Sequence, residues 1–337
     1  MGDVVPPKPI SSSDIAWTEW SDVPRFALRY RHLTIAAMGE DYHVGVAIEE
    51  LAPGMQSVPS HYHIFEEEHL YVLEGSLTTR IGDNAYEMKA GDYVCYPAGQ
   101  RAGHCLINNS GKVCRYVIVG ERNPNEVVVY PDSSKVLVRA LGRRAIFDMN
   151  AMRGYWDGEN TGLPAGELAL NEMGLAPIAP FVPKAPIPSQ DVAWEATHES
   201  DRFGGRARHL THAAVGRHYH VGMLIESPAP GKRLAPMHYH MLEEEHALIL
   251  EGQVTLLLDD ERHEMKPGDF VSFPAGLKVP HSFMNSGTGP CSYLMIGERN
   301  LSDVCVYPDS NKIMVAALRS HQDIFDMSGV RDYWDGE

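Results

Sequence analysis

The sequence predicts an all-β protein made of two copies of one small β-sandwich or barrel domain. Three observations lead to this fold class. A segment as long as a whole domain occurs twice, so that His61 and His238 open the same motif 177 residues apart (238 − 61). Each copy consists of short strand-like runs that end at turn residues. Neither copy contains a long run with helical periodicity.

The repeat sets the domain organisation. Both copies end in YWDGE, and the constant offset joins these matched pairs: Trp17 and Trp194, Gly75 and Gly252, His104 and His281. We predict an N-terminal domain over residues 1–160 and a C-terminal domain over residues 188–337. Residues 161–187 between them are rich in Pro, Ala and Gly, and the prolines exclude a continuous helix, so this segment is predicted to be a linker.

Turn residues divide each copy into strands. HLYVLEG and its counterpart HALILEG end in glycine, while YVCYPAG and FVSFPAG stop at Pro-x-Gly. Many short strands with regularly spaced turns are typical of a sandwich or a small barrel.

Composition and charge limit the class of partner. The chain has 337 residues and a net charge of −16, from 45 acidic and 29 basic side chains. A field of this sign repels nucleic acid and anionic membranes, so neither is an expected partner. The start, MGDVVPPKPI, lacks the basic and apolar segments of a signal peptide, and no apolar run is long enough for a membrane helix. We expect a cytoplasmic protein whose five cysteines are buried free thiols.

The motifs HYHIFEEEH and HYHMLEEEH carry the clearest chemistry. Residues i and i+2 of a strand point to one face, so His61 and His63 project together, as do His238 and His240. Another histidine, His104 or His281, follows about 40 residues later. Three histidines and a nearby carboxylate in each copy are typical of a metal site, although this spacing alone leaves open which of the three glutamates takes part.

Two longer patterns contain these residues. G-x6-H-x-H-x4-E-x6-G spans 54–75 and 231–252, and G-x5-P-x-G-x4-H-x3-N spans 91–108 and 268–285. They resemble the two signature motifs of the cupin superfamily, and each half is similar to a bacterial single-cupin group with a YWDGE-like tail. The resemblance implies a jelly-roll barrel in each copy, hence a bicupin. It also implies two sets of metal ligands: His61, His63, Glu68 and His104, and His238, His240, Glu245 and His281.

The choice of Glu68 also has support from strand geometry. In a strand that begins at Glu68, this residue shares a face with Leu70 and Val72, which suit a barrel interior. The remaining glutamates of the two motifs are then expected to form a solvated turn at the barrel mouth. The alternative is that they accept hydrogen bonds from the ligand imidazoles; these residues are Glu66, Glu67, Glu243 and Glu244.

A site with three histidines and one carboxylate leaves open positions on a divalent transition metal ion, one in each barrel. We favour Fe or Mn, with Ni, Cu and Zn as alternatives. Related bicupins include quercetinase-like dioxygenases and oxalate decarboxylases, but the arginine that precedes the first ligand in the decarboxylases is missing here. We therefore expect a dioxygenase-type oxidoreductase that acts on a small organic, oxygen-chelating substrate. A non-redox isomerase, lyase or decarboxylase and a non-catalytic metal-binding cupin are the alternatives.

Other matched residues have a structural interpretation. His43 and His220 are expected to be structural histidines rather than acid–base groups in the cavity. Trp156 and Trp334, in the repeated tails, are expected to close the barrels. Jelly-roll sheets often pair across subunits, which predicts a homo-oligomer, and a monomer with internal pseudo-symmetry is the alternative.

Overall fold

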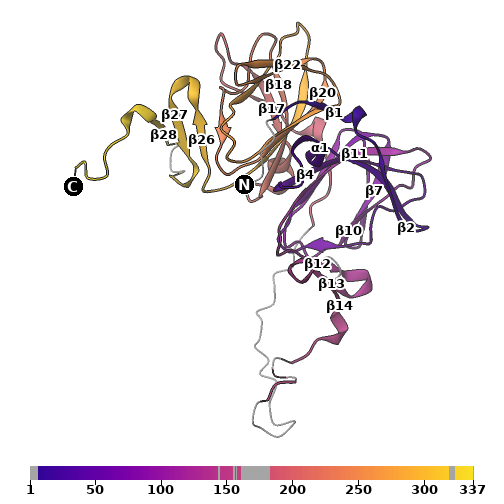
Figure 1. Cartoon of the computed structure of the whole chain (residues 1–337). Coiled ribbons are helices and arrows are strands. Elements are labelled where there is room, and N and C mark those ends of the chain that lie inside the picture. The colour runs from indigo at the N-terminus through magenta and orange to yellow at the C-terminus, as the bar shows by residue number, and fades with distance from the viewer. Residues whose placement is uncertain are drawn as a thin grey trace.

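The computed structural model describes residues 7–142, 145–154, 156, 158–160, 183–318 and 323–336. These residues form two β-barrels, one from each half of the chain, and a strand arm projects from each barrel (Figure 1). The duplicated all-β jelly-roll fold expected from the sequence is confirmed. Most of the predicted linker, residues 161–182, lies outside the described residues. Among the described helices, none has the length and apolar character needed to span a membrane.

The first barrel consists of a seven-stranded sheet and a three-stranded sheet that lie face to face. Helix α1 (Leu33–Met38) joins two strands of the larger sheet. From edge to edge, the larger sheet contains β15 (Ile187–Pro188), β9 (Asp92–Tyr96), β6 (Glu68–Glu74), β11 (Cys114–Glu121), β4 (Val44–Leu51), β3 (Phe26–His32) and β2 (Thr18–Val23). The smaller sheet contains β10 (His104–Ile107), β7 (Ser76–Ile81) and β8 (Asn84–Lys89).

The second barrel repeats this design, with helix α2 (Leu210–Val215) in the place of α1. Its larger sheet contains β1 (Ile10–Ser11), β23 (Asp269–Phe273), β20 (Glu245–Glu251), β25 (Ser292–Glu298), β18 (Val221–Pro228), β17 (Gly205–His209) and β16 (Glu195–Ala196). Its smaller sheet contains β22 (Glu261–Met265), β21 (Val254–Leu258) and β24 (His281–Met284).

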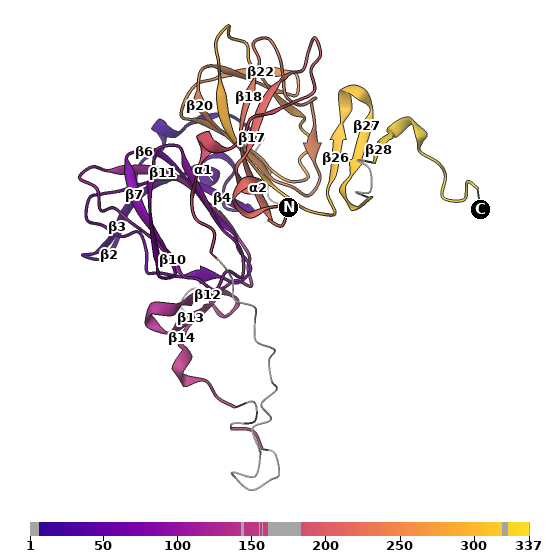
Figure 2. The same cartoon turned by 180° about the vertical axis from the view of Figure 1, so that it is seen from behind.

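The two halves exchange their first strands. Strand β1 pairs with β23 of the second barrel, while β15, which opens the second half, pairs with β9 of the first barrel. Helices α1 and α2 lie where the barrels meet (Figure 2), and each packs on the opposite barrel, against β23 and β9 respectively. The domain boundary predicted at residue 188 thus falls within a strand that joins the sheet of the first barrel.

Each larger sheet is apolar on both faces, for different reasons. The inner faces line two separate barrel cores, which include Leu70 and Val72 in the first barrel and Ile249 in the second. The outer faces pack on each other and form one core shared by both halves, with Val46 and Met223 among its members. All five cysteines are buried and free, as predicted. Burial of both faces makes the two halves one packed body.

A four-stranded sheet forms the base of each arm. Its innermost strand carries the HYH motif, so each arm starts beside a candidate metal site. The strands are β5 (Tyr62–His63), β12 (Val127–Tyr130), β13 (Lys135–Val138) and β14 (Ile146–Asp148), and, in the second half, β19 (Tyr239–His240), β26 (Val304–Tyr307), β27 (Lys312–Val315) and β28 (Ile324–Asp326). Trp156 and Trp334 are 51% and 73% exposed on these arms, so the expectation that they close the barrels is wrong.

Short turns complete the described structure. They are single 3₁₀ turns at Ser12–Asp14, Pro131–Ser133, Arg139–Leu141, Met149–Ala151, Ser189–Asp191, Pro308–Ser310, Ala316–Leu318 and Met327–Gly329.

Candidate metal centres

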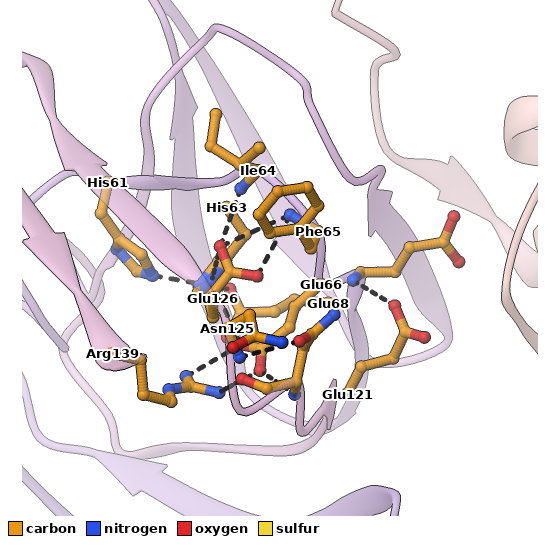
Figure 3. Close-up of polar contacts among 12 residues, drawn as sticks. His61, His63, Ile64, Phe65, Glu66, Glu68, Glu121, Asn125, Glu126 and Arg139 are labelled. Atoms are coloured by element: carbon orange, nitrogen blue, oxygen red, sulfur yellow. Dashed lines mark hydrogen bonds and ion pairs between the residues drawn. The ribbon is translucent and has the colours of Figure 1, made fainter. Parts of the chain in front are cut away.

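Three strands bring the four candidate ligands of the first barrel together. His61 and His63 flank Tyr62 at β5, Glu68 opens β6, and His104 opens β10. Figure 3 shows His61, His63 and Glu68 in this cluster. The backbones of His61 and His104 exchange hydrogen bonds of 3.1 and 2.7 Å, which fixes these two residues side by side. The parity argument for Glu68 agrees with the structure, because Leu70 and Val72 on the same face of β6 belong to the barrel core.

The imidazole nitrogens converge on one carboxylate oxygen. Glu68 Oε2 lies 2.7 Å from His104 Nε2, 3.6 Å from His61 Nε2 and 3.5 Å from His63 Nε2. In the second barrel, Glu245 Oε2 lies 2.9 Å from the Nε2 atom of the last histidine and 3.6 Å from those of the other two, which are His281, His238 and His240. The structure therefore brings together all eight residues that the sequence singled out, in two equivalent groups.

The second nitrogen of the first ligand histidine faces a backbone carbonyl in both barrels. His61 Nδ1 lies 3.0 Å from the carbonyl oxygen of Pro59, and His238 Nδ1 lies 2.8 Å from that of Pro236. A proton on Nδ1 leaves a lone pair on Nε2, the atom that points into the site.

The middle histidine of each set faces carboxylates. His240 Nδ1 lies 2.7 Å from Asp303 Oδ2, whereas His63 Nδ1 lies 3.4 Å from Glu66 Oε2 and 3.6 Å from Glu126 Oε1. Such carboxylate partners orient metal-ligating histidines and make them more basic. The contact is short in the second barrel and loose in the first.

Aromatic rings support the third histidine. Tyr96 stacks on His104 at a ring-centroid distance of 3.8 Å, and Phe273 stacks on His281 at 3.6 Å. Stacking fixes the ring plane and shields one face of the ligand from water.

The protonation of these side chains suits metal binding. Burial opposes the charge on Glu68, but the adjoining histidines hold its pKa well below the usual range, so it is a carboxylate at neutral pH. Burial lowers the pKa of His104 and of His281 to about 4, so both rings are neutral. Burial also disfavours a charge on His63, yet the surrounding carboxylates raise its pKa well above the usual range. A metal ion bound at this site would displace that proton.

The donor set fits a divalent transition metal. The ligand atoms of His61, His63 and Glu68 lie within 4.8 Å of one another, and so do those of His238, Glu245 and His281. His63 Nε2 is buried without a hydrogen-bond partner, and a buried nitrogen of this kind is costly unless something binds it. Three imidazoles and one carboxylate suit Fe, Mn, Ni, Cu or Zn and leave positions on the ion for a substrate.

The remaining glutamates are not a solvated turn. Glu66, Glu67 and Glu244 are only 2–3% exposed, so that expectation is wrong for them, and the side chain of Glu243 is 12% exposed. Glu66 forms a short contact with Arg139 and approaches His63 (Figure 3). It also accepts a hydrogen bond from the backbone N–H of Asn123. Glu66 therefore fits the alternative expectation, a carboxylate that supports a ligand histidine.

Sequence reasoning missed a pair of interior carboxyls. Glu49 and Glu226 lie on the inner face of β4 and β18, since the alternate residues on these strands pack between the barrels. The hydroxyl of Tyr116 donates to Glu49 Oε2 at 2.8 Å, and Tyr293 bonds Glu226 in the same way. Burial raises the pKa of both carboxyls to about 7. The sequence did contain a signal for these carboxyls, because Glu49 and Glu226 are matched acidic residues within apolar strand segments of the two copies.

Other missed residues belong to the surroundings of the ligands. Glu126 and Asp303 are matched acids at the start of the arms, and their offset of 177 residues (303 − 126) could have identified them. Pro7, next to the exchanged strand β1, lines a small pocket at the second site together with His240, Glu245 and His281. The exchange therefore carries part of the first half to the mouth of the second barrel. No sequence pattern pointed to this contact.

Comparison with known proteins finds a family match in each half of the chain, over the segments that carry the candidate ligands. The cupin-domain family model matches residues 47–120 and 224–297. The chain is 25% identical over 240 residues to the quercetin 2,3-dioxygenase of Bacillus subtilis, an alignment that covers 67% of this chain and 65% of that protein. Overall, the chain spans between 44% and 65% of the length of the curated relatives it matches.

Solved structures agree on the fold. The oxalate decarboxylase of Bacillus subtilis superposes with a TM-score of 0.53 and 16% identity, over 89% of this chain and 78% of that one. The protein Ylba from E. coli gives a TM-score of 0.54 and 14% identity, over 88% of this chain and 94% of that one. At these identities the likeness establishes the arrangement of the two barrels.

Proposed function

We propose that this chain, in which each half matches the cupin-domain family model and the fold is that of two jelly-roll barrels, is a metal-dependent bicupin enzyme with a divalent transition metal ion in each barrel. Each ion is bound by three histidines and one glutamate, and the reaction is a dioxygenase-type oxidation of a small organic molecule that chelates the metal through oxygen atoms. The observation that carries this proposal is the convergence of three Nε2 atoms on one carboxylate oxygen in both barrels.

The relative with 25% identity supports the choice of reaction, because it is a quercetin 2,3-dioxygenase. A redox-active ion held by these histidines and the glutamate would have free coordination positions, and would supply the capacity for electron transfer to oxygen and for polarising a chelating substrate. The residues of the chain contribute orientation and proton control. Glu126 and Asp303 orient ligand imidazoles, and Glu49 and Glu226 are interior carboxyls with pKa values of about 7, which suits an acid–base group near neutral pH.

Metal content and oxygen uptake test this function. Elemental analysis of the protein purified from its native host is expected to give about two equivalents of a redox-active metal per chain. The Fe(II)-loaded protein should consume oxygen with at least one member of a panel of enolic and catecholic compounds. If no metal supports oxygen uptake with any of them, the dioxygenase proposal is wrong.

Non-redox catalysis is the second candidate, and the pair of interior carboxyls favours it, because decarboxylation and isomerisation both need a proton donor. Substrate loss without oxygen uptake, supported equally by Mn and Zn, would identify this class. The variants Glu49→Gln and Glu226→Gln should then lose turnover while they retain metal.

A further inference from the structure

We propose that the middle glutamates, Glu67 and Glu244, are positioning residues. Each side chain is held by backbone amides of the opposite barrel, and this contact fixes the position of the candidate ligand that follows it in the chain. Each is the chain neighbour of a candidate ligand, Glu68 or Glu245, and each is anchored by the opposite half of the chain. The inference rests on the proposed metal centres and adds that neither is complete within its own barrel.

The first anchor is a pair of backbone amides. Glu67 Oε2 accepts hydrogen bonds from the backbone N–H groups of His220 and Val221, at 2.8 and 3.1 Å. Both donors stand at the start of strand β18 in the second barrel. The carboxylate is 2% exposed and its Oε2 also lies 3.7 Å from His69 Nε2 in its own barrel, so these two amides and that imidazole together offset the cost of burying the charge. Charge-assisted bonds of this kind are about twice as strong as neutral ones.

The second anchor is the neighbouring residue Glu121. Glu121 Oε2 accepts a hydrogen bond from the backbone N–H of Glu67 at 2.7 Å and lies 3.0 Å from His220 Nδ1. The carbonyl of Glu67 in turn accepts a bond from the backbone N–H of Glu121 at 3.2 Å. One histidine of the second barrel is thus tied, through its backbone and its ring, to both glutamates of the first.

The same contacts occur in the opposite direction. Glu244 Oε2 accepts from the backbone N–H groups of His43 and Val44 at 2.8 and 3.1 Å, and Glu298 Oε2 lies 2.9 Å from His43 Nδ1. The backbone N–H of Glu244 donates to Glu298 Oε2 at 2.8 Å. Corresponding distances in the two networks agree within 0.2 Å, so the network belongs to the repeated design.

The peptide bond transmits the position of the anchor to the ligand. The carbonyl of Glu67 belongs to the peptide unit that continues into Glu68, and that unit is fixed by Glu121. Glu68 is paired with Gly120 on β11, and the side chain of Glu68 lies beside this glycine, which has no side chain of its own to contact it. If the anchor is lost, the start of β6 can shift, and a displacement well below 1 Å is enough to weaken a metal site.

The three consecutive glutamates therefore have three different partners. Glu66 contacts Arg139 in the arm of its own half, Glu67 contacts the opposite barrel, and Glu68 faces the histidine cluster. Of these three glutamates, the middle one contacts the opposite half. Its removal should therefore weaken metal binding at its own site, in addition to any effect on the stability of the whole fold.

The test uses full-length chains with one metal site each. The double variant His238→Ala/His240→Ala keeps the first site, and His61→Ala/His63→Ala keeps the second. The dissociation constant for Mn(II) is measured by electron paramagnetic resonance at a temperature well below unfolding. With only the first site present, Glu67→Ala is expected to raise this constant about 10-fold, the lower end of the range for residues that support ligands. Glu67→Gln, whose amide oxygen still accepts both hydrogen bonds, should restore most of the affinity.

The opposite site supplies the matched control. With only the second site present, Glu67→Ala should leave the dissociation constant for Mn(II) unchanged within the error of the measurement, whereas Glu244→Ala should raise it about 10-fold. A role in general stability alone would lower the unfolding temperature in both backgrounds and leave the affinity of the folded protein unchanged. Equal weakening at both sites, or no weakening at the first, would overturn the inference.

A variant in the second barrel covers the case in which Glu67→Ala fails to fold. With only the first site present, His220→Ala should raise the dissociation constant about twofold, since it removes one exposed ion pair from the anchor. His198→Ala, at an exposed position outside this network, should leave it unchanged. Glu68→Gln separates the two proposals: if it too leaves Mn(II) binding intact, the metal centre itself is wrong, and if it alone abolishes binding, only the positioning role is wrong.

Discussion

The two barrels share their ligands but differ in what supports them. All four candidate ligands and the anchor across the barrel interface are the same in both halves. Four positions around the ligands differ: Glu126 against Asp303, Arg139 against Ala316, Tyr96 against Phe273, and Val128 against Cys305, which pair with His63 and His240 on the adjacent strand. After the duplication, the chain kept the atoms that face the candidate metal and changed the groups behind them. The two sites are therefore expected to hold the same type of ion with different affinity.

The largest effect should come from the ligand carboxylates, where the barrels are equal. Glu68→Gln and Glu245→Gln each replace a charged donor by a weak neutral one, so each should lower affinity at its own site by more than about 100-fold, beyond the effect of changing a supporting residue. Elemental analysis after dialysis should show the loss of one of two bound ions in each variant. If both variants kept two tightly bound ions, the assignment of the ligands would be wrong.

Removing the carboxylates that contact the middle histidines should lower metal affinity by different amounts at the two sites. Asp303→Asn removes the charged partner of His240 at 2.7 Å and should weaken the second site by about 10-fold or more. Glu126→Gln should have a smaller effect on the first site, because His63 Nδ1 lies 3.6 Å from Glu126 Oε1, whereas the second glutamate near the ring is equivalent in both sites. Metal titration of single-site chains checks this order, and an equal effect at both sites would contradict the asymmetry.

The contact between Arg139 in the arm and Glu66 should contribute to the free energy of unfolding. Arg139→Ala leaves the buried carboxylate of Glu66 with the backbone of Asn123 as its remaining donor outside the site, which should lower the free energy of unfolding by about 1–2 kcal/mol. Urea unfolding of the metal-free protein measures this change. The second half has alanine at the matched position, so Ala316→Gly is a suitable control and should change the stability less. An equal loss in both variants would show that the ion pair has no special role.

The smallest effect should be the pH dependence of the anchor across the barrel interface. The hydrogen bond with Glu298 raises the pKa of His43 from 6.5 to about 9, and Glu121 raises the pKa of His220 in the same way. A raised histidine pKa stabilises the folded state fully below pH 6.5, and this contribution is lost as the pH rises to about 9. Both side chains are 55% exposed, so the total should stay below about 1 kcal/mol.

Unfolding temperatures measured between pH 6 and 9.5 test this window. The wild-type protein should lose more stability across it than the double variant His43→Ala/His220→Ala. Parallel curves for the two proteins would show that the histidine–glutamate pairs contribute nothing measurable.

Much of this protein could be predicted from the sequence, because the information was local. Strand alternation placed His61 beside His63 and turned Glu68 toward Leu70 and Val72, and the repeat extended this reasoning to the second half. Local spacing could not reveal the partners of Glu66, since Arg139 lies 73 residues away, nor the position of Trp334 on an exposed arm. Those facts depend on how separate segments pack.

The sequence alone determined the duplicated β-fold, the turns that end its strands and the two pairs of histidines that share a strand face, because periodicity and spacing along one strand fix which side chains point the same way. The resemblance to the cupin motifs implied the remaining candidate ligands. Only the tertiary structure decided that the halves exchange β1 and β15 and that Glu67 and Glu244 are bound by the opposite barrel. Both features require residues more than 90 positions apart to meet, and that meeting results from the packing of two apolar sheet faces on each other.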